Sequence, residues 1–114
     1  MPYCSASDVR LLSGVTSDVV NDTDINSLIA FSDQQIDDDI QSFVSVPTRI
    51  KNLSALLTSV KLFSRPDLRF RLGQSGLTDQ QMDNALGQWK EEIDRIYAYY
   101  GKAVQESPSD LRVA

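Results

Sequence analysis

The side chains of this chain that could do chemistry are mainly carboxylates, because its 114 residues include sixteen Asp and Glu and no histidine. The absence of histidine excludes Ser-His-Asp and Cys-His catalytic arrangements and histidine-ligated metal sites. Neither the phosphate-binding motif G-x-x-x-x-G-K-[ST] nor the dinucleotide-binding motif G-x-G-x-x-G occurs in the sequence. We therefore predict that the protein is not an enzyme and that it holds no metal or cofactor.

The densest group of carboxylates is the run Asp37-Asp38-Asp39. Consecutive helical residues point about 100° apart, so these three side chains cannot converge on one cation and are predicted to form a solvated helix face. The single cysteine, Cys4, has neither a second thiol nor a histidine with which to share a zinc ion. We predict that it packs in the core, where free cysteine is usually found.

The chain length fits one domain with one hydrophobic core. Hydrophobic residues make up 41% of the sequence and charged residues 24%, close to the averages of globular proteins, so the chain is predicted to fold. No apolar run approaches the ~18–20 residues that span a bilayer, and the first residues lack the basic and apolar stretches of a signal peptide. We expect no membrane contact, and a location in the cytoplasm of the cell that makes the protein.

Apolar periodicity predicts an all-α fold, a small bundle of about four helices with a long C-terminal helix and an extended C-terminal tail. We divide the chain into a helical domain at residues 1–105 and a flexible tail at residues 106–114. The tail contains Ser107-Pro108-Ser109, which cannot continue a helix, and little that could be buried.

The first two predicted helices are marked by their caps. Ser5 as N-cap begins a short helix that ends at Gly14. Asn21 or Thr23 caps the second helix, which is predicted to extend over about five turns towards Pro47. Its buried stripe has steps of mostly three and four residues: Ile25, Leu28, Ile29, Ser32, Ile36, Ile40 and Phe43.

The third predicted helix runs from about Thr48 to Ser64 and has the most apolar middle of the four. Arg65-Pro66 is predicted to end it. The following segment, as far as Gly76, mixes arginines, apolar residues and glycines, and we predict a connector there.

The last predicted helix spans about residues 79–100 and begins with a capping box formed by Thr78 and Gln81. Gly101 is predicted to end it. Its apolar residues form a heptad seam that is predicted to pack on the second and third helices as core: Met82, Leu86, Trp89, Ile93, Ile96 and Tyr100.

Charge is unevenly distributed along the chain. Residues 1–45 contain eight acids and one base, residues 46–75 contain one acid and six bases, and residues 76–114 contain seven acids and four bases. The segments therefore carry minus seven, plus five and minus three, for a net charge of minus five. This asymmetry can orient like subunits head to tail, acidic surface to basic surface, with solvated faces that have no partner as the alternative.

The N-terminal part of the chain resembles a known family. Residues 3–14 (YCSASDVRLLSG) are similar to the short first helix, and residues 22–37 (DTDINSLIAFSDQQID) to the acidic second helix, of the head-tail connector or head-completion adaptor proteins of tailed viruses. The resemblance covers about the first 45 residues, and the rest agrees only in the order of helices. The chain departs from the family at Ser45-Val46-Pro47-Thr48, where Gly or aromatic residues are common.

The resemblance implies a virion structural protein that forms a ring of about a dozen copies on the portal protein, in the neck between head and tail. Such a ring extends the DNA channel and docks a downstream tail or stopper protein, and DNA passes through it without sequence-specific binding. On this hypothesis the acidic second helix, with Asp33, Asp37 and Asp38, lines the channel, where like charge opposes phosphate binding. Three arginines would contact an acidic neighbour or the portal, with loop solubility as the alternative: Arg65, Arg69 and Arg71.

Two further groups of residues are predicted to contact partners. Tyr97 and Tyr99 fall outside the heptad seam and are expected at a subunit interface, because tyrosine is enriched in interface cores. Leu111 and Val113 flank Arg112 in the tail, and this alternation suits a strand added to the edge of a partner's sheet. A frayed terminus is the alternative interpretation of the tail.

Two other functions remain open from the sequence. A small nucleic-acid-binding regulator could use the basic 49–71 segment as its phosphate footprint, although the net charge of the chain has the wrong sign for this. That footprint would consist of Arg49, Lys51, Lys61, Arg65, Arg69 and Arg71. A helical protein-binding adaptor cannot be distinguished from a connector by sequence.

Overall fold

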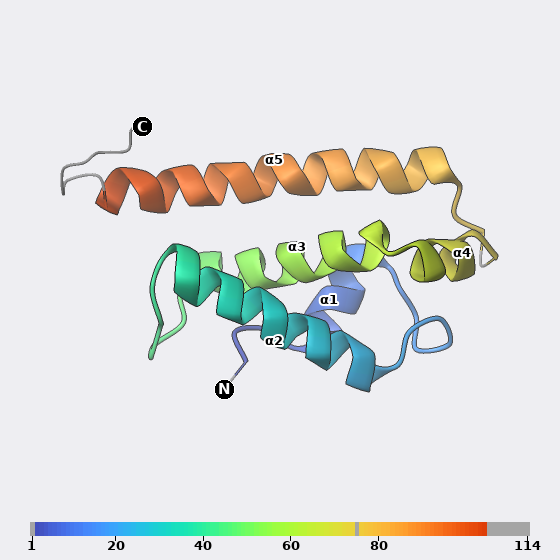
Figure 1. Ribbon diagram of the computed structural model, residues 1–114, viewed down its shortest axis with the longest axis horizontal. Helices are drawn as coiled ribbons and strands as arrows, with labels where there is room; N and C mark the ends of the chain where they lie inside the picture. The colour runs from blue at the N-terminus through green and yellow to red at the C-terminus, as the bar shows by residue number, and fades with distance from the viewer. Residues whose placement is uncertain (1, 75, 105–114) are drawn as a thin grey trace.

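The computed structural model describes residues 2–74 and 76–104, and in these ranges the chain is all-α, as its periodicity predicts (Figure 1). The described residues form five helices and no strand. The helices are α1 (Ala6–Ser13), α2 (Asp22–Asp39), α3 (Thr48–Ser64), α4 (Pro66–Gln74) and α5 (Asp79–Val104). None of them is long and apolar enough to cross a membrane.

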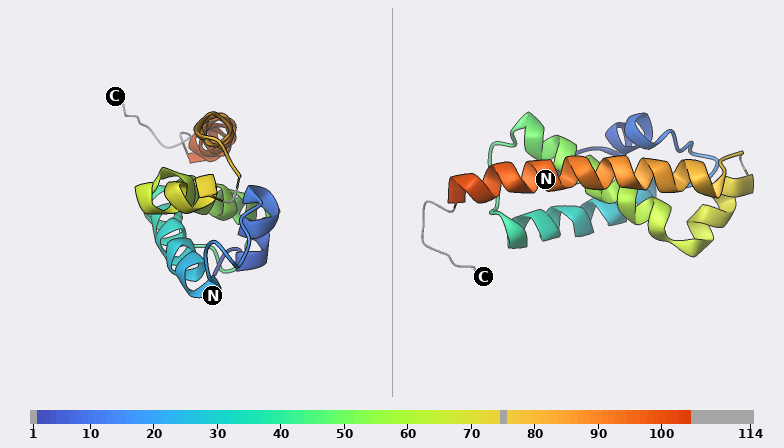
Figure 2. Two further views of the ribbon diagram at one scale, coloured as in Figure 1. Left: turned by 90° about the vertical axis from the view of Figure 1, so that its right-hand side faces the viewer. Right: turned by 90° about the horizontal axis from the view of Figure 1, so that it is seen from above.

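Helix α3 is the centre of the fold because it contacts each of the other four helices. Helices α1 and α2 pack on one side of it, and α5 lies along the other side as a separate layer (Figure 2). Ten of the seventeen residues of α3 are buried, among them the small residues Ser54, Ala55, Thr58 and Ser59. Small side chains on several faces let neighbouring helices approach α3 closely, and this explains its central place.

The predicted caps are confirmed. The Ser5 hydroxyl accepts a hydrogen bond from the Asp8 amide, and the Asp8 carboxylate accepts one from the Ser5 amide, which completes a capping box at the start of α1. Gly14 ends α1 with a φ of 76°, a left-handed conformation that glycine adopts without strain. Asn21, not Thr23, is the N-cap of α2, and its side-chain oxygen accepts from the Asp24 amide at 2.8 Å.

The prediction of a connector after Pro66 is wrong, because residues 66–74 form helix α4. Proline ends α3 but suits the first position of the next helix, where its missing N–H is not needed and its φ is already helical. Leu68 and Leu72 lie one turn apart and are both buried against the core. Their burial makes the short helix stable despite its polar composition.

Two predicted helix ends are also wrong. Helix α2 ends at Asp39 and not near Phe43, and Ile40 has left the helical conformation with φ −120° and ψ −77°. The Phe43 amide donates to the Tyr3 hydroxyl at 3.0 Å, so its ring reaches the core from a loop. Helix α5 continues through Gly101 to Val104, because glycine permits a helix end but does not impose one.

The heptad seam of α5 is core, as predicted. Met82, Leu86, Trp89, Ile93 and Ile96 are buried, while Tyr100 is half-buried at the far end. The seam packs on α3 and α4, and the predicted packing on α2 is wrong. Within the described residues, α2 and α5 are linked near their C-terminal ends by a hydrogen bond from the Tyr97 hydroxyl to Asp39, 2.8 Å long.

Candidate interaction surfaces

Two of the three aspartates predicted to line a channel face inward. One oxygen of Asp33 accepts from the Ser54 hydroxyl at 2.6 Å, and the other accepts from the Tyr3 amide at 2.9 Å. Asp37 accepts from the Tyr3 hydroxyl at 2.5 Å. These carboxylates therefore hold the N-terminal segment against α2 and α3, and Asp38 is the one of the three that remains exposed.

The side chains of the acidic run at the end of α2, residues 37–39, point in different directions, as their helical spacing predicts. Asp37 contacts Tyr3, Asp39 contacts Tyr97, and Asp38 lies between them on the outer face. The solvated face predicted for the run therefore holds for Asp38 and Asp39, which are exposed, whereas Asp37 is half-buried. Among the described residues, no three His, Cys, Asp or Glu side chains come together as a metal site would require.

Cys4 is buried, as predicted, with its sulfur 3.2 Å from the Ser54 hydroxyl. Burial raises the pKa of the Cys4 thiol from 9.0 to about 11, because the thiolate would lose its hydration. The thiol is therefore protonated at neutral pH. It packs as a small apolar group and has little nucleophilic character.

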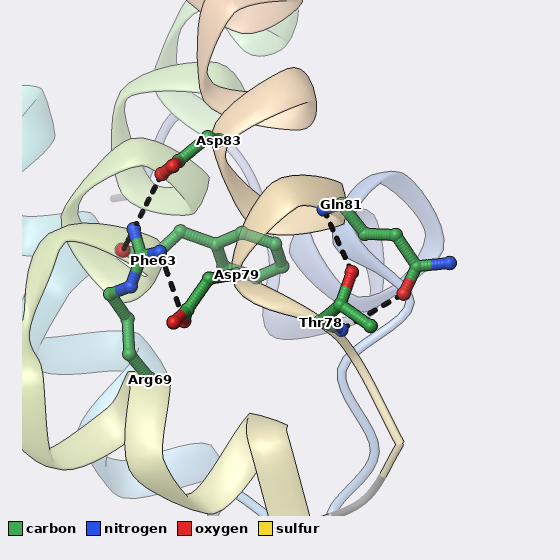
Figure 3. A network of polar contacts seen from close by, with 6 residues as sticks. All are labelled: Phe63, Arg69, Thr78, Asp79, Gln81 and Asp83. Carbon is green, nitrogen blue, oxygen red and sulfur yellow. Dashed lines mark hydrogen bonds and ion pairs between the residues drawn. The ribbon is translucent and has the colours of Figure 1, made fainter.

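Arg69 is engaged within the chain. Its guanidinium donates to Asp83 at 3.0 Å and to Asp79 at 3.3 Å, and it also reaches the Phe63 carbonyl at the end of α3 (Figure 3). The bonds to Asp83 and Asp79 raise the pKa of Arg69 above its ordinary value. Arg69 thus joins α3 and α4 to the first turn of α5, which the Thr78–Gln81 capping box begins.

The other basic residues of the 49–71 segment also have partners in the chain. Arg65 forms an ion pair with Asp67, and Arg71 donates to the Val19 carbonyl at 3.3 Å. Lys61 donates to Gln35, and burial lowers the pKa of its ammonium group. The two remaining cations, Arg49 and Lys51, lie beside Tyr99 and Asp8 respectively. The six cations are thus distributed over several local contacts.

The two tyrosines predicted at an interface lie in different environments. Tyr97 is half-buried, and burial together with its hydrogen bond to Asp39 raises the pKa of its hydroxyl. Tyr99 is 51% exposed, and the guanidinium of Arg49 stacks over its ring at 3.8 Å from the centroid. Tyr97 therefore belongs to the body of the molecule, and Tyr99 offers an aromatic surface to solvent.

An open groove lies between α1 and α5, with α3 as its floor. One part of it has a volume of about 600 Å³ and the adjoining part about 540 Å³, and the two share Asn52, Glu92 and Ile96. The α1–α5 groove is lined by Asp8, Leu11, Leu12, Thr48, Arg49, Lys51, Asn52, Ala55, Leu56, Glu92, Arg95, Ile96 and Tyr99, with Pro47 at one end. Leu11 on its rim is 88% exposed.

Sequence reasoning missed Leu11 and Phe31 as surface residues. Val9 and Leu11 both follow the Ser5 cap, but residues two apart lie on nearly opposite sides of a helix, and Val9 is the buried one. Phe31 is 66% exposed because it falls outside the stripe that α2 buries. An aromatic residue on the polar side of an amphipathic helix was the signal available in the sequence.

The predicted docking residues Leu111, Arg112 and Val113, with the rest of the 106–114 tail, lie outside the described residues. Comparison of the chain with protein-family models, with curated proteins and with solved structures finds no match.

Proposed function

We propose that this chain is a virion structural protein, a head-tail connector subunit that forms a ring on the portal, extends the DNA channel and docks the next tail component. The observation that carries the proposal is the α1–α5 groove, with the exposed Leu11 lining one part and the exposed Tyr99 lining the adjoining part. An open surface of this size with apolar rims is typical of a protein that binds another macromolecule. Its α1 rim belongs to the segment that resembles the connector family.

The charge of the chain supports passage of DNA without binding. A ring of about a dozen subunits, each with a net charge of minus five, is strongly acidic as a whole. Nucleic acid binds proteins chiefly by exchanging its counterions for Lys and Arg, so an acidic ring opposes binding. Three of the six cations between residues 49 and 71 support the same conclusion, because carboxylates within the chain partly neutralise Lys51, Arg65 and Arg69.

The hypothesis of a nucleic-acid-binding regulator therefore has less support than the connector hypothesis. Its proposed footprint includes Lys61, which is half-buried, and Arg69, which lies between two carboxylates. A phosphate would have to displace those carboxylates to reach Arg69. A protein-binding adaptor that works as a monomer stays open as the third function, because it too would use an open groove.

The mass of the assembled protein tests the proposal. Light scattering after gel filtration and negative-stain images are recorded for the chain alone, and then with the portal protein of the same virus. The connector hypothesis predicts rings of about a dozen subunits, at high protein concentration or on the portal template. A chain that remains monomeric in both experiments refutes it, and a dimer that shifts a DNA duplex would favour the regulator.

A further inference from the structure

The outer face of α2 carries a stripe of exposed residues that the monomer does not use. Asp24, Ser27, Phe31, Gln34 and Asp38 are spaced by three, four, three and four residues, so they form one line along the helix. We name this line the α2 ridge. Its middle is the phenyl ring of Phe31, 66% exposed, and an acid stands near each end.

The opposite face of α2 accounts for the packing of this helix on the core. Ile25, Leu28, Ile29, Ser32 and Ile36 are its buried residues. Phe31 therefore adds nothing to that packing, and a polar residue would serve the monomer equally well. In the described part of the chain, neither Asp24 nor Asp38 forms an ion pair.

The α1–α5 groove has the size to receive the middle of the ridge, whose full length from Asp24 to Asp38 is about 21 Å. Along α3 it extends from Thr48 to Leu56, about 12 Å, which accommodates two turns of a partner helix. Leu11, Leu12, Ala55, Leu56 and Ile96 supply apolar surface for an aromatic ring. Among the charged residues of the lining, Lys51 pairs with Asp8 and Arg95 pairs with Glu92, so Arg49 gives the groove an excess of one positive charge.

The ridge and the groove are two separate surfaces with no residue in common. The groove is bounded by α1, α3 and α5, and α2 contributes nothing to its lining. Figure 2 shows α1 and α2 as separate helices on the side of α3 that faces away from α5. A contact between the ridge of one copy and the groove of the next is heterologous, so it leaves a free ridge at one end of the pair and a free groove at the other. Repetition of such a contact forms a ring when its rotation closes, and an open filament when it does not.

We propose that the α2 ridge of one copy docks in the α1–α5 groove of the next copy, and that this contact is the repeated interface of the ring. The inference rests on the proposed function and deepens it. Phe31 enters the apolar part of the neighbour's groove between Leu11 and Ile96. Asp24 and Asp38 each lie about 10 Å from Phe31 along the ridge, so the acid at the Thr48 end of the groove approaches Arg49. This arrangement buries the outer face of α2 between subunits, so that face does not form the channel wall.

Three substitutions with the same change of charge test the contact. Phe31→Glu removes the ridge, Leu11→Glu blocks the groove, and Phe70→Glu is the control. Phe70 is 67% exposed on α4, outside both surfaces. All three positions are exposed, so far-UV circular dichroism and thermal unfolding of each variant should match the unchanged protein. Sedimentation velocity then measures assembly, with and without the portal protein.

Phe31→Glu and Leu11→Glu are each expected to weaken assembly at least tenfold, which corresponds to about 1.4 kcal/mol per contact, while Phe70→Glu assembles normally. A mixture of the first two variants provides the sharper result. Phe31→Glu keeps an intact groove and Leu11→Glu keeps an intact ridge, so they should form a 1:1 heterodimer that cannot extend further.

Normal rings from either interface variant, or a mixture that stays monomeric, would overturn the ridge-in-groove contact. If the unchanged chain still forms rings in that case, the proposed function stands and another surface joins the subunits. Absence of rings from the unchanged chain, alone and on the portal, refutes the proposed function and this contact with it.

Discussion

Substitution of Asp33 tests whether the inward-facing carboxylates hold the fold together. Asp33 connects α2 to Ser54 of α3 and to the backbone of Tyr3, so one side chain joins three segments. In Asp33→Ala the Ser54 hydroxyl and the Tyr3 amide both lose an acceptor. Hydrogen bonds to a charged group contribute about 1.5–3 kcal/mol each when buried.

Asp33 is only half-buried, so water can replace part of what is lost. We therefore expect Asp33→Ala to lower the free energy of unfolding by about 2–3 kcal/mol, near the lower end of the sum of two such bonds. Asp33→Asn keeps one acceptor oxygen and should lose about half as much. Asp38→Ala is the matched control from the same helix, and a surface change of this kind should stay within about 0.5 kcal/mol.

Urea unfolding followed by circular dichroism at 222 nm measures these differences. A second readout is the reactivity of Cys4, whose sulfur lies 3.2 Å from the same Ser54 hydroxyl. Detachment of the N-terminal segment in Asp33→Ala should expose this thiol to alkylation. Equal unfolding free energies for Asp33→Ala and Asp38→Ala, with unchanged Cys4 reactivity, would refute a structural role for the inward-facing carboxylates.

Three further predictions concern the core, the thiol and the contact between α2 and α5. Trp89→Ala should destabilise the fold by about 3–5 kcal/mol in chemical denaturation, because the indole is buried with its ring centroid 4.8 Å from that of Phe63. A loss below about 1 kcal/mol would contradict the placement of Trp89 in the core. Alkylation of Cys4 at pH 8 should be at least 100-fold slower than that of glutathione, because burial raises the pKa of the thiol to about 11. The folded thiol also binds its proton more tightly than the unfolded one, so the free energy of unfolding should fall as pH rises from about 9 to about 11. Tyr97→Phe should cost about 1 kcal/mol by loss of the bond to Asp39, and Asp39→Asn combined with it should add little, which a double-mutant cycle measures.

The parts of the fold that the sequence predicts correctly depend on neighbouring residues. The Ser5–Asp8 and Thr78–Gln81 boxes involve partners three residues apart, and the seam of α5 repeats at steps of three and four. Helix α4 was not predicted because its stability comes from the burial of Leu68 and Leu72 in the core, where α4 packs on α3 and α5, and no periodicity within nine residues shows this. The same sequence without that burial would be a connector.

The surfaces were harder to predict because their partners are distant in sequence. Asp33 and Asp37 occupy the polar side of α2 in a helical projection, and nothing local shows that Tyr3, thirty or more residues away, covers them. The partners of Arg69 are equally hard to predict, since its two carboxylate partners lie ten and fourteen residues further along the chain. A basic or acidic run in a sequence therefore gives the charge of a segment. Only the fold shows how many of those charged side chains are exposed and free to contact a partner.

This redistribution of charge affects how the subunits would recognise one another. Asp33, Asp37 and Asp39 accept hydrogen bonds within the chain, so these carboxylates are held against the monomer, and the acids of the ridge are Asp24 and Asp38. Such a small number of complementary charges orients the subunits and raises their rate of association, but it adds little to the affinity. Burial of the exposed aromatic and aliphatic surface must then supply most of the binding free energy. Phe31 and Leu11 thus contribute more to the affinity of the proposed interface than the uneven distribution of charge along the chain.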